Sequence, residues 1–249
     1  MNFTKEIKKF TKICYQPIIE KTDDLNYAGS KYYGNVWISN EDTWPVNENG
    51  TFYTFIYQLD IKSLPEEYQK KINKTGILQF FYDTSIHTED NDHLVRIVEP
   101  NDNGQYFSQP TNQNKDHNYK VNDASPQSLI IKEWKAHDDY PSWDESFDEL
   151  SELWENIQEH EDFDDEKYSP ILGDKLGGYC YFAQAGGSSE ELIYQIQFDE
   201  NEEYDEKQFP SYAPCLVASD GTGHLFINND DEIDNTNMEH LFDFYWSCG

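Results

Sequence analysis

The chain has few positively charged residues, and this shortage excludes several classes of function. Of its 249 residues, 18 are Lys or Arg and 49 are Asp or Glu, which gives a formal net charge of −31 at pH 7. Proteins that bind nucleic acids place Lys and Arg against phosphates, and anionic membranes attract basic segments. We therefore expect no nucleic-acid partner and no membrane partner. An acidic surface instead favours a basic protein partner.

Cysteine is also scarce, and long apolar runs are absent. The four cysteines (Cys14, Cys180, Cys215 and Cys248) are far apart and form no C-x-x-C pair. We therefore expect no zinc site. We expect the cysteines to be free thiols in a reducing cytoplasm. No stretch approaches 18 apolar residues, and the N-terminus lacks the apolar core of a signal peptide. We expect neither a transmembrane helix nor a secretory signal, and hence a cytoplasmic protein.

The common catalytic and cofactor-binding motifs are missing as well. The chain has no G-x-S-x-G, H-E-x-x-H, G-x-G-x-x-G or Walker sequence. The acidic stretch from Asn228 to Asp234 lacks the Gly and the regular spacing of a calcium loop, which favours a solvated turn. Cys180 follows a Gly-Gly turn, where a reactive thiol could sit, but no cation lies near it in the sequence to lower its pKa. The sequence predicts no catalytic residue, no metal and no cofactor.

The chain does have a repeated motif built from aromatic strands. Each copy runs from a Gly turn, through a strand with Tyr-Gln at its centre, to a second Gly turn and an aromatic strand. The period-two alternation at 52–61 and 192–198 is typical of half-buried strands. We expect a single domain over 1–249 with two related β units, 28–100 and 168–249. The expected equivalent pairs are Gly34 with Gly178, Gln58 with Gln195, and Gly76 with Gly223.

An acidic segment between the two copies carries the clearest helix signal. Residues 137–166 contain 14 Asp or Glu and no Lys or Arg. Ser142 and Glu145 form a capping box, and apolar residues follow at helical spacing. A shorter amphipathic helix is expected from Phe3 to Ile13, and a final strand over 242–246. These patterns predict an α+β fold, mostly antiparallel sheet, with an acidic linking helix whose buried stripe is Trp143, Phe147, Leu150, Trp154 and Ile157.

The order of these short motifs resembles the YwqG-like family, over roughly residues 13–248. That family is a domain of unknown function, so the resemblance implies a fold and no activity, and similar domains are suspected in toxin–immunity settings. The chain departs from the family pattern where Val36 and Cys180 stand in place of Pro, and where Tyr33-Gly34 replaces Gly-Gly. The motifs are Ser30-Lys31-x-x-Gly34, Tyr57-Gln58-Leu59-Asp60, Gly76-Ile77-Leu78-Gln79-Phe80-Phe81, Leu176-Gly177-Gly178-Tyr179, Tyr194-Gln195-Ile196 and Gly223-x-Leu225-Phe226-Ile227.

Three functions fit these observations. The leading hypothesis is a non-enzymatic interaction protein, such as an immunity or antitoxin-like protein, that neutralises a basic effector. The second is a small-molecule or glycan-binding domain, and the third is a hydrolase with paired carboxylates, for which the many acids offer no obvious pair. The proposed partner surface is Asp144, Asp148, Glu149, Glu152 and Glu155. The ligand-binding alternative uses Trp44, Gln58 and Gln195, although a cross-strand hydrogen bond that links the two halves is the favoured role for these glutamines.

Overall fold

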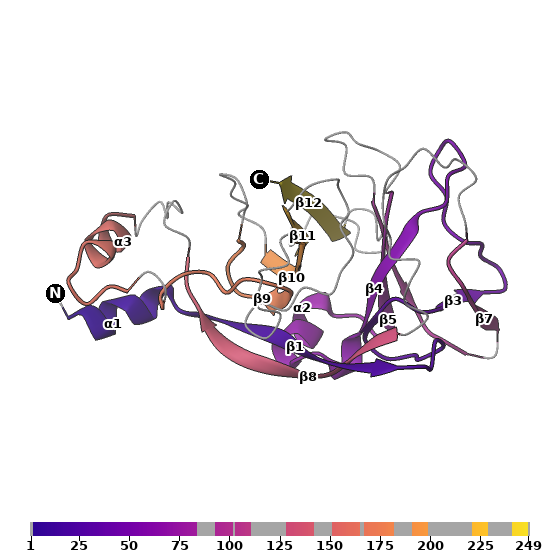
Figure 1. The fold of residues 1–249 in the computed structure, drawn as a ribbon, viewed down its shortest axis with the longest axis horizontal. Helices are drawn as coiled ribbons and strands as arrows, with labels where there is room; N and C mark the ends of the chain where they lie inside the picture. Colours follow the sequence, from indigo (N-terminus) through magenta and orange to yellow (C-terminus); the bar gives the residue numbers. More distant parts are fainter. Residues whose placement is uncertain are drawn as a thin grey trace.

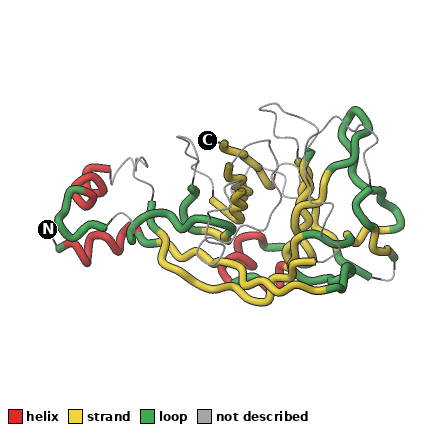
Figure 2. The backbone as a smooth tube through the Cα atoms, in the orientation of Figure 1, coloured by secondary structure: helices red, strands yellow, loops and turns green. Residues whose placement is uncertain are grey.

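One antiparallel sheet of ten strands dominates the structure (Figures 1 and 2). The computed structural model describes residues 2–83, 93–101, 103–110, 128–141, 151–164, 167–181, 191–198, 221–228 and 241–248. The sheet order is β12-β11-β10-β9-β1-β8-β2-β4-β5-β6. The strands are β1 (Lys12–Thr22), β2 (Lys31–Tyr32), β4 (Thr54–Asp60), β5 (Ile77–Tyr82), β6 (His93–Val98), β8 (Ser128–Asp139), β9 (Lys175–Gly177), β10 (Glu191–Phe198), β11 (Gly221–Ile227) and β12 (Phe242–Cys248).

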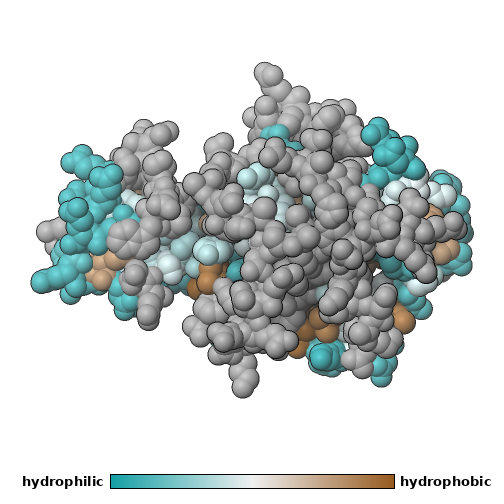
Figure 3. All heavy atoms as spheres, turned by 45° about the horizontal axis from the view of Figure 1, so that its top comes forward, coloured by the Kyte–Doolittle hydropathy of each residue, from teal (hydrophilic) through white to brown (hydrophobic). Residues whose placement is uncertain are grey.

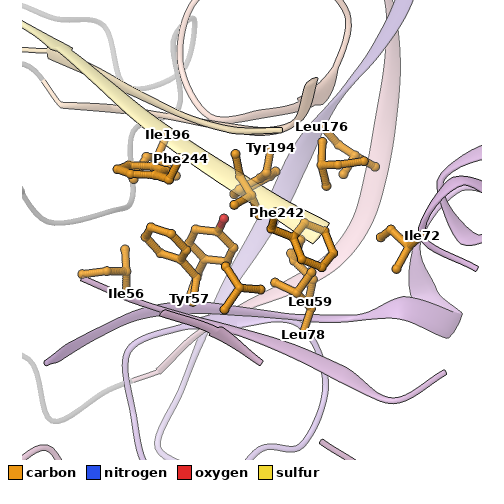
Figure 4. Packing of buried hydrophobic residues seen from close by; sticks show 14 of the residues in the cluster. Ile56, Tyr57, Leu59, Ile72, Leu78, Leu176, Tyr194, Ile196, Phe242 and Phe244 are labelled. Atoms are coloured by element: carbon orange, nitrogen blue, oxygen red, sulfur yellow. The ribbon is translucent and has the colours of Figure 1, made fainter. Parts of the chain in front are cut away.

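The sheet bends until its two ends face each other across one apolar core. Phe80 of β5 and Phe244 of β12 lie with ring centroids 4.7 Å apart, and His93 Nε2 of β6 lies 3.5 Å from the carbonyl oxygen of Phe242. In Figure 4, side chains from both halves, among them Tyr57 and Tyr194, point toward one another. Their ring centroids are 4.9 Å apart. The sheet is therefore nearly closed, like a barrel.

The α+β prediction is wrong in its balance of elements. The helices are α1 (Phe3–Ile7), α2 (Glu66–Ile72) and α3 (Ser151–Gln158), with the 3-10 turns η1 (Lys8–Phe10) and η2 (Ile61–Ser63). None of the described α-helices exceeds eight residues, whereas β8 alone has twelve. The core is closed by sheet against sheet, so no helix layer is needed to cover it. The fold is mostly antiparallel β.

The strand order is symmetric about the central β1–β8 pair. On either side, β9 and β2, β10 and β4, β11 and β5, and β12 and β6 occupy matching places. The register matches too, because Lys31 pairs with Gln58 and Lys175 pairs with Gln195. A bulge interrupts the ladder just before Tyr57 in one half and just before Tyr194 in the other. We propose that this symmetry reflects the duplication expected from the sequence.

The register changes one of the expected residue pairs. Gln79 lies opposite Gln58, and His224 lies opposite Gln195. Counting back along both strands, Gly76 corresponds to Gly221 and not to Gly223. The Gly-x-Gly sequence of β11 offers two glycines, and the sequence spacing alone does not show which of them corresponds to Gly76.

The first-half sheet is covered on its outer face by a small hairpin-like sheet, β3 (Val36–Ser39) and β7 (Gly104–Phe107). A second apolar cluster, which includes Trp44, Phe55 and Phe81, lies beneath it. For this reason six of the seven β4 residues are buried, on both faces, although their sequence alternates between apolar and polar residues.

A small helical lobe projects from one end of the sheet (Figure 1). Phe3, Ile7 and Phe10 pack there with Trp154 and Ile157 of α3 in a separate core. The predicted burial of Trp154 and Ile157 is confirmed, while Trp143, Phe147 and Leu150 lie outside the described residues.

Two predicted helix boundaries are wrong. The N-terminal helical region ends at Phe10, and Ile13 belongs to β1, where it is exposed. The predicted linker 137–166 also starts too early, because β8 extends to Asp139. The C-terminal strand is confirmed, with Phe242, Phe244 and Trp246 buried.

Candidate functional site

The Gly177-Gly178 turn at the end of β9 is the centre of the candidate site. Both residues have positive φ, +67° and +82°, which favours glycine. There is also no room for a side chain. A Cβ on Gly177 would lie 1.5 Å from Tyr68 Oη, and one on Gly178 would lie 2.0 Å from Asp139 Oδ2. The turn is therefore packed tightly against α2 on one side and β8 on the other.

A buried ion pair fixes this turn from below. Lys175 Nζ lies 2.8 Å from Asp139 Oδ2, and both side chains are fully buried. The same carboxylate accepts hydrogen bonds from the backbone N–H of Tyr179, at 2.7 Å, and of Ile171, at 2.6 Å. A buried carboxylate with three donors has its negative charge well satisfied. The backbone that leaves the turn is held rigidly in place as a result.

A cavity of about 310 Å³ opens above the turn. This is near the lower end of the usual size of small-molecule sites. Its walls come from β1, α2, β10 and the turn itself, which are distant in the sequence. The lining residues are Lys12, Ile13, Glu67, Tyr68, Lys71, Gly178, Tyr179, Cys180, Glu191 and Leu192.

The cavity brings charges of both signs together with two phenol rings. Lys71 Nζ lies 2.6 Å from Glu191 Oε1 and 4.5 Å from the centre of the Tyr68 ring. Lys12 Nζ lies 4.0 Å from the centre of the Tyr179 ring. Such contacts between an ammonium and a ring face are attractive and hold the lysine in place.

The acidic side of the cavity is linked to β1. The Tyr15 hydroxyl donates a 2.8 Å hydrogen bond to Glu67 Oε1. Burial, and then this hydrogen bond, raise the pKa of Tyr15 to about 12. Burial and the nearby Glu67 also raise the pKa of Tyr68. Both phenols therefore stay protonated and can act as hydrogen-bond donors at neutral pH.

The environment of Cys180 differs from the one expected from the sequence. Lys12 and Lys71 line the same cavity as this half-buried thiol, although neither is near it in the sequence. Cys14, which pairs with Gly177 beneath the turn, is fully buried, and burial raises the pKa of its thiol to about 12. The Gly-Gly motif could locate the turn, but no sequence spacing could reveal the lysines.

The corresponding turn in the first half has a different charge balance. Tyr33 and Gly34 have φ values of +60° and +79°, close to those of Gly177 and Gly178. The buried Lys31 behind this turn donates to two carbonyl oxygens, those of Leu25 at 3.1 Å and Asn35 at 2.7 Å. Burial lowers the pKa of Lys31 to about 8, although Asp24 opposes the shift. In the second half, the buried Lys175 is thus neutralised by the carboxylate of Asp139. In the first half, the buried Lys31 is stabilised by backbone carbonyl oxygens.

Comparison with known protein families shows which family the chain belongs to. The sequence profile described as "Domain of unknown function (DUF1963)" matches residues 30–244. The chain belongs to the DUF1963 family. The match begins at Ser30, just before β2, and runs into β12, so it includes both Gly turns. No curated protein matches the chain.

In this DUF1963 chain, the glutamines of the ligand-binding hypothesis bond to nearby backbone. Gln195 accepts from the N–H of Tyr181 at 2.8 Å and donates to the carbonyl of Gly173 at 3.0 Å. Gln58 donates to the carbonyl of Gly29 at 2.8 Å. Each glutamine therefore holds the segment that leads into its own Gly turn, and neither lines the cavity.

Trp44, the third residue of that hypothesis, belongs to the apolar cluster under the small sheet. It is buried beneath β3, and its Nε1 donates to the carbonyl of Tyr53 at 2.9 Å. Neither of two cavities formed by the described residues contains Trp44, Gln58 or Gln195, and binding of a ligand by them stays a prediction.

The acidic surface of the leading hypothesis is only partly described. Glu152 and Glu155 of α3 are exposed on the projecting lobe, whereas Asp144, Asp148 and Glu149 lie outside the described residues. No described α-helix is long and apolar enough to span a bilayer. The described residues also contain no group of three or more His, Cys, Asp or Glu side chains placed to hold a metal ion.

Proposed function

We propose that this protein is a non-enzymatic acidic interaction protein that binds a basic protein partner, as an immunity or antitoxin-like protein does. The observation that supports this most directly is the exposed acidic side of a rigid lobe. Glu152, Glu155 and Glu159 are exposed on and beside α3, while Trp154 and Ile157 anchor the helix. The turn after the helix adds further exposed acids, Glu161, Asp162 and Asp164. In Figure 3, hydrophilic side chains are prominent on this lobe, at the left of the view, beside a few hydrophobic ones.

The same lobe carries a smaller basic surface. Lys5, Lys8 and Lys9 are exposed on α1 and η1, which pack on the same small core. The lobe therefore has a basic side on α1 and η1 and an acidic side on α3, within a molecule that is acidic as a whole. A basic partner would be drawn to the whole protein and then turned toward the α3 side.

The test is the kinetics of association with the protein encoded beside this one. Charge reversal of Asp148, Glu149, Glu152 and Glu155 to Lys should slow association at least tenfold, by the size of steering effects. Added salt should slow the wild-type association steeply and change dissociation less, because screening shortens the reach of surface charge. The matched control reverses four acids outside the lobe: Glu20 of β1, Asp60 of β4, Glu66 of α2 and Glu99 just after β6. A flat salt response, or normal binding by the α3 variant, would contradict the proposal.

The cavity at the Gly177-Gly178 turn supports a second function, the binding of a small molecule. Its support is a preformed hollow with a rigid floor, both signs of charge and two phenol rings. This function moves the ligand-binding hypothesis away from Trp44, Gln58 and Gln195. We also propose the finer YwqG-like assignment, from the order of the motifs, and a cytoplasmic location, from the few and widely spaced cysteines.

A further inference from the structure

The charged groups of the cavity divide into one neutralised pair and two remaining charges. Lys71 and Glu191 are in direct ion contact, so they cancel each other. Lys12 and Glu67 also line the cavity, but neither forms an ion pair with any described residue. Lys12 rests on the Tyr179 ring, and Glu67 accepts one hydrogen bond from Tyr15. The cavity therefore offers one ammonium and one carboxylate that are free to receive a ligand's opposite charges.

The two remaining charges come from separate elements, and both residues are exposed. Lys12 is the first residue of β1 and pairs with Asp139 of β8. Glu67 lies in the first turn of α2. None of the ion pairs among the described residues joins Lys12 to Glu67, so their charged groups are more than ion-pair distance apart. A ligand that satisfies both must carry a negative and a positive group and be small enough for about 310 Å³.

We propose that this cavity binds a small zwitterion of the α-amino-acid class, with the ligand carboxylate on Lys12 and the ligand ammonium on Glu67. Charge-assisted hydrogen bonds of this kind are roughly twice as strong as neutral ones. The apolar part of the wall, Ile13 and Leu192, receives the ligand's side chain. This inference rests on the second proposed function, the binding of a small molecule at the turn.

Cys180 provides a direct readout of occupancy. Its thiol lines the cavity, so a bound ligand should slow its reaction with the small neutral reagent iodoacetamide. Peptide mapping by mass spectrometry of the full wild-type chain follows Cys180 separately from the other thiols. Cys14 is fully buried and provides an internal control for unfolding, since it reacts only when the sheet opens.

The experiment compares a panel of amino acids with singly charged analogues of the same size, such as alanine with propionate and with propylamine. We expect one or more amino acids to slow alkylation of Cys180 several-fold and to raise the melting temperature, while the matching acid and amine do neither. Lys12→Met and Glu67→Gln should each weaken this protection about tenfold or more. Glu66→Gln, on the same helix but ion-paired with Lys70 and highly exposed, should leave it unchanged.

Other results overturn the inference in distinguishable ways. Protection by propionate alone, lost in Lys12→Met but kept in Glu67→Gln, would mean an anion site and would refute the zwitterion while sustaining small-molecule binding. Protection unaffected by either substitution would place the ligand elsewhere and refute the assignment of both residues. If none of the amino acids, acids or amines protects Cys180, both the zwitterion and the second proposed function fail.

Discussion

Replacing His224 with Gln should make the protein more resistant to acid without weakening it at neutral pH. His224 Nε2 lies 2.9 Å from the carbonyl oxygen of Tyr181. At the matching place in the other half, Gln79 Nε2 donates to the carbonyl oxygen of Trp37 at 3.1 Å. The fold therefore already uses Gln in this role, and His224→Gln should preserve the hydrogen bond with little change in volume.

The magnitude follows from the buried ring of His224. Burial lowers the pKa of His224 from 6.5 to about 3, although its backbone hydrogen bond opposes the shift. Above pH 6.5 the ring is neutral in both the folded and the unfolded chain, so it causes no pH dependence. Between pH 6.5 and 3 only the unfolded chain takes up the proton, which lowers the free energy of unfolding by about 1.4 kcal/mol per pH unit. At pH 5 the loss relative to pH 7 is about 2 kcal/mol.

The assay is urea-induced unfolding, followed by tryptophan fluorescence at pH 7, 6 and 5. The variant and the wild type should match at pH 7, and the variant should be more stable by about 2 kcal/mol at pH 5. The reverse exchange, Gln79→His, provides the matched control, because it should add acid sensitivity to the other half. Parallel stability profiles for the wild type and His224→Gln between pH 7 and 5 would refute the reasoning.

The remaining predictions concern stability and use the same unfolding assay at pH 7. Asp139→Asn should cost about 3–5 kcal/mol, because it leaves the buried Lys175 without its counter-charge; a loss under 1 kcal/mol would show that the pair does not hold the turn. Gly178→Ala should cost more than Gly50→Ala, since both have positive φ but only the first would meet another atom, Asp139 Oδ2 at 2.0 Å; equal losses would contradict this. Trp154→Ala should cost about 3–5 kcal/mol because its side chain is fully buried in the lobe, and an unchanged midpoint would count against it.

The strands that alternate strictly between apolar and polar residues could be predicted from the sequence. β4 and β10 lie where the period-two patterns placed them, because successive side chains of a strand point to opposite faces. The expected half-burial of these strands is wrong, since both of their faces are buried. The aromatic C-terminal strand, β12, could also be predicted from its sequence. The central strands β1 and β8 were not, because each is paired on both edges and carries mixed exposed and buried residues without a simple period.

The candidate site could be predicted only at its turn. Two adjacent glycines mark a sharp backbone path, and this signal is local. Lys12, Glu67 and Lys71 come together with the turn only because the sheet closes on itself and places α2 beside β9. Gln58 and Gln195 bond to the backbone next to each turn, in keeping with the hydrogen bonds within the fold that their sequence positions favoured over ligand contacts.

The pairing of β1 with β8 and β9 has a consequence for how the chain folds as it is synthesised. β1 lies near the N-terminus, yet Lys12 pairs with Asp139 and Cys14 with Gly177. At typical translation rates of about 5–20 residues per second, β1 waits roughly 6–25 seconds for its first partner strand. Through this interval an eleven-residue strand with exposed Ile13 and Ile18 has both edges open. The charges at its two ends, Lys12, Glu20 and Lys21, would then act as gatekeepers against pairing with other nascent chains.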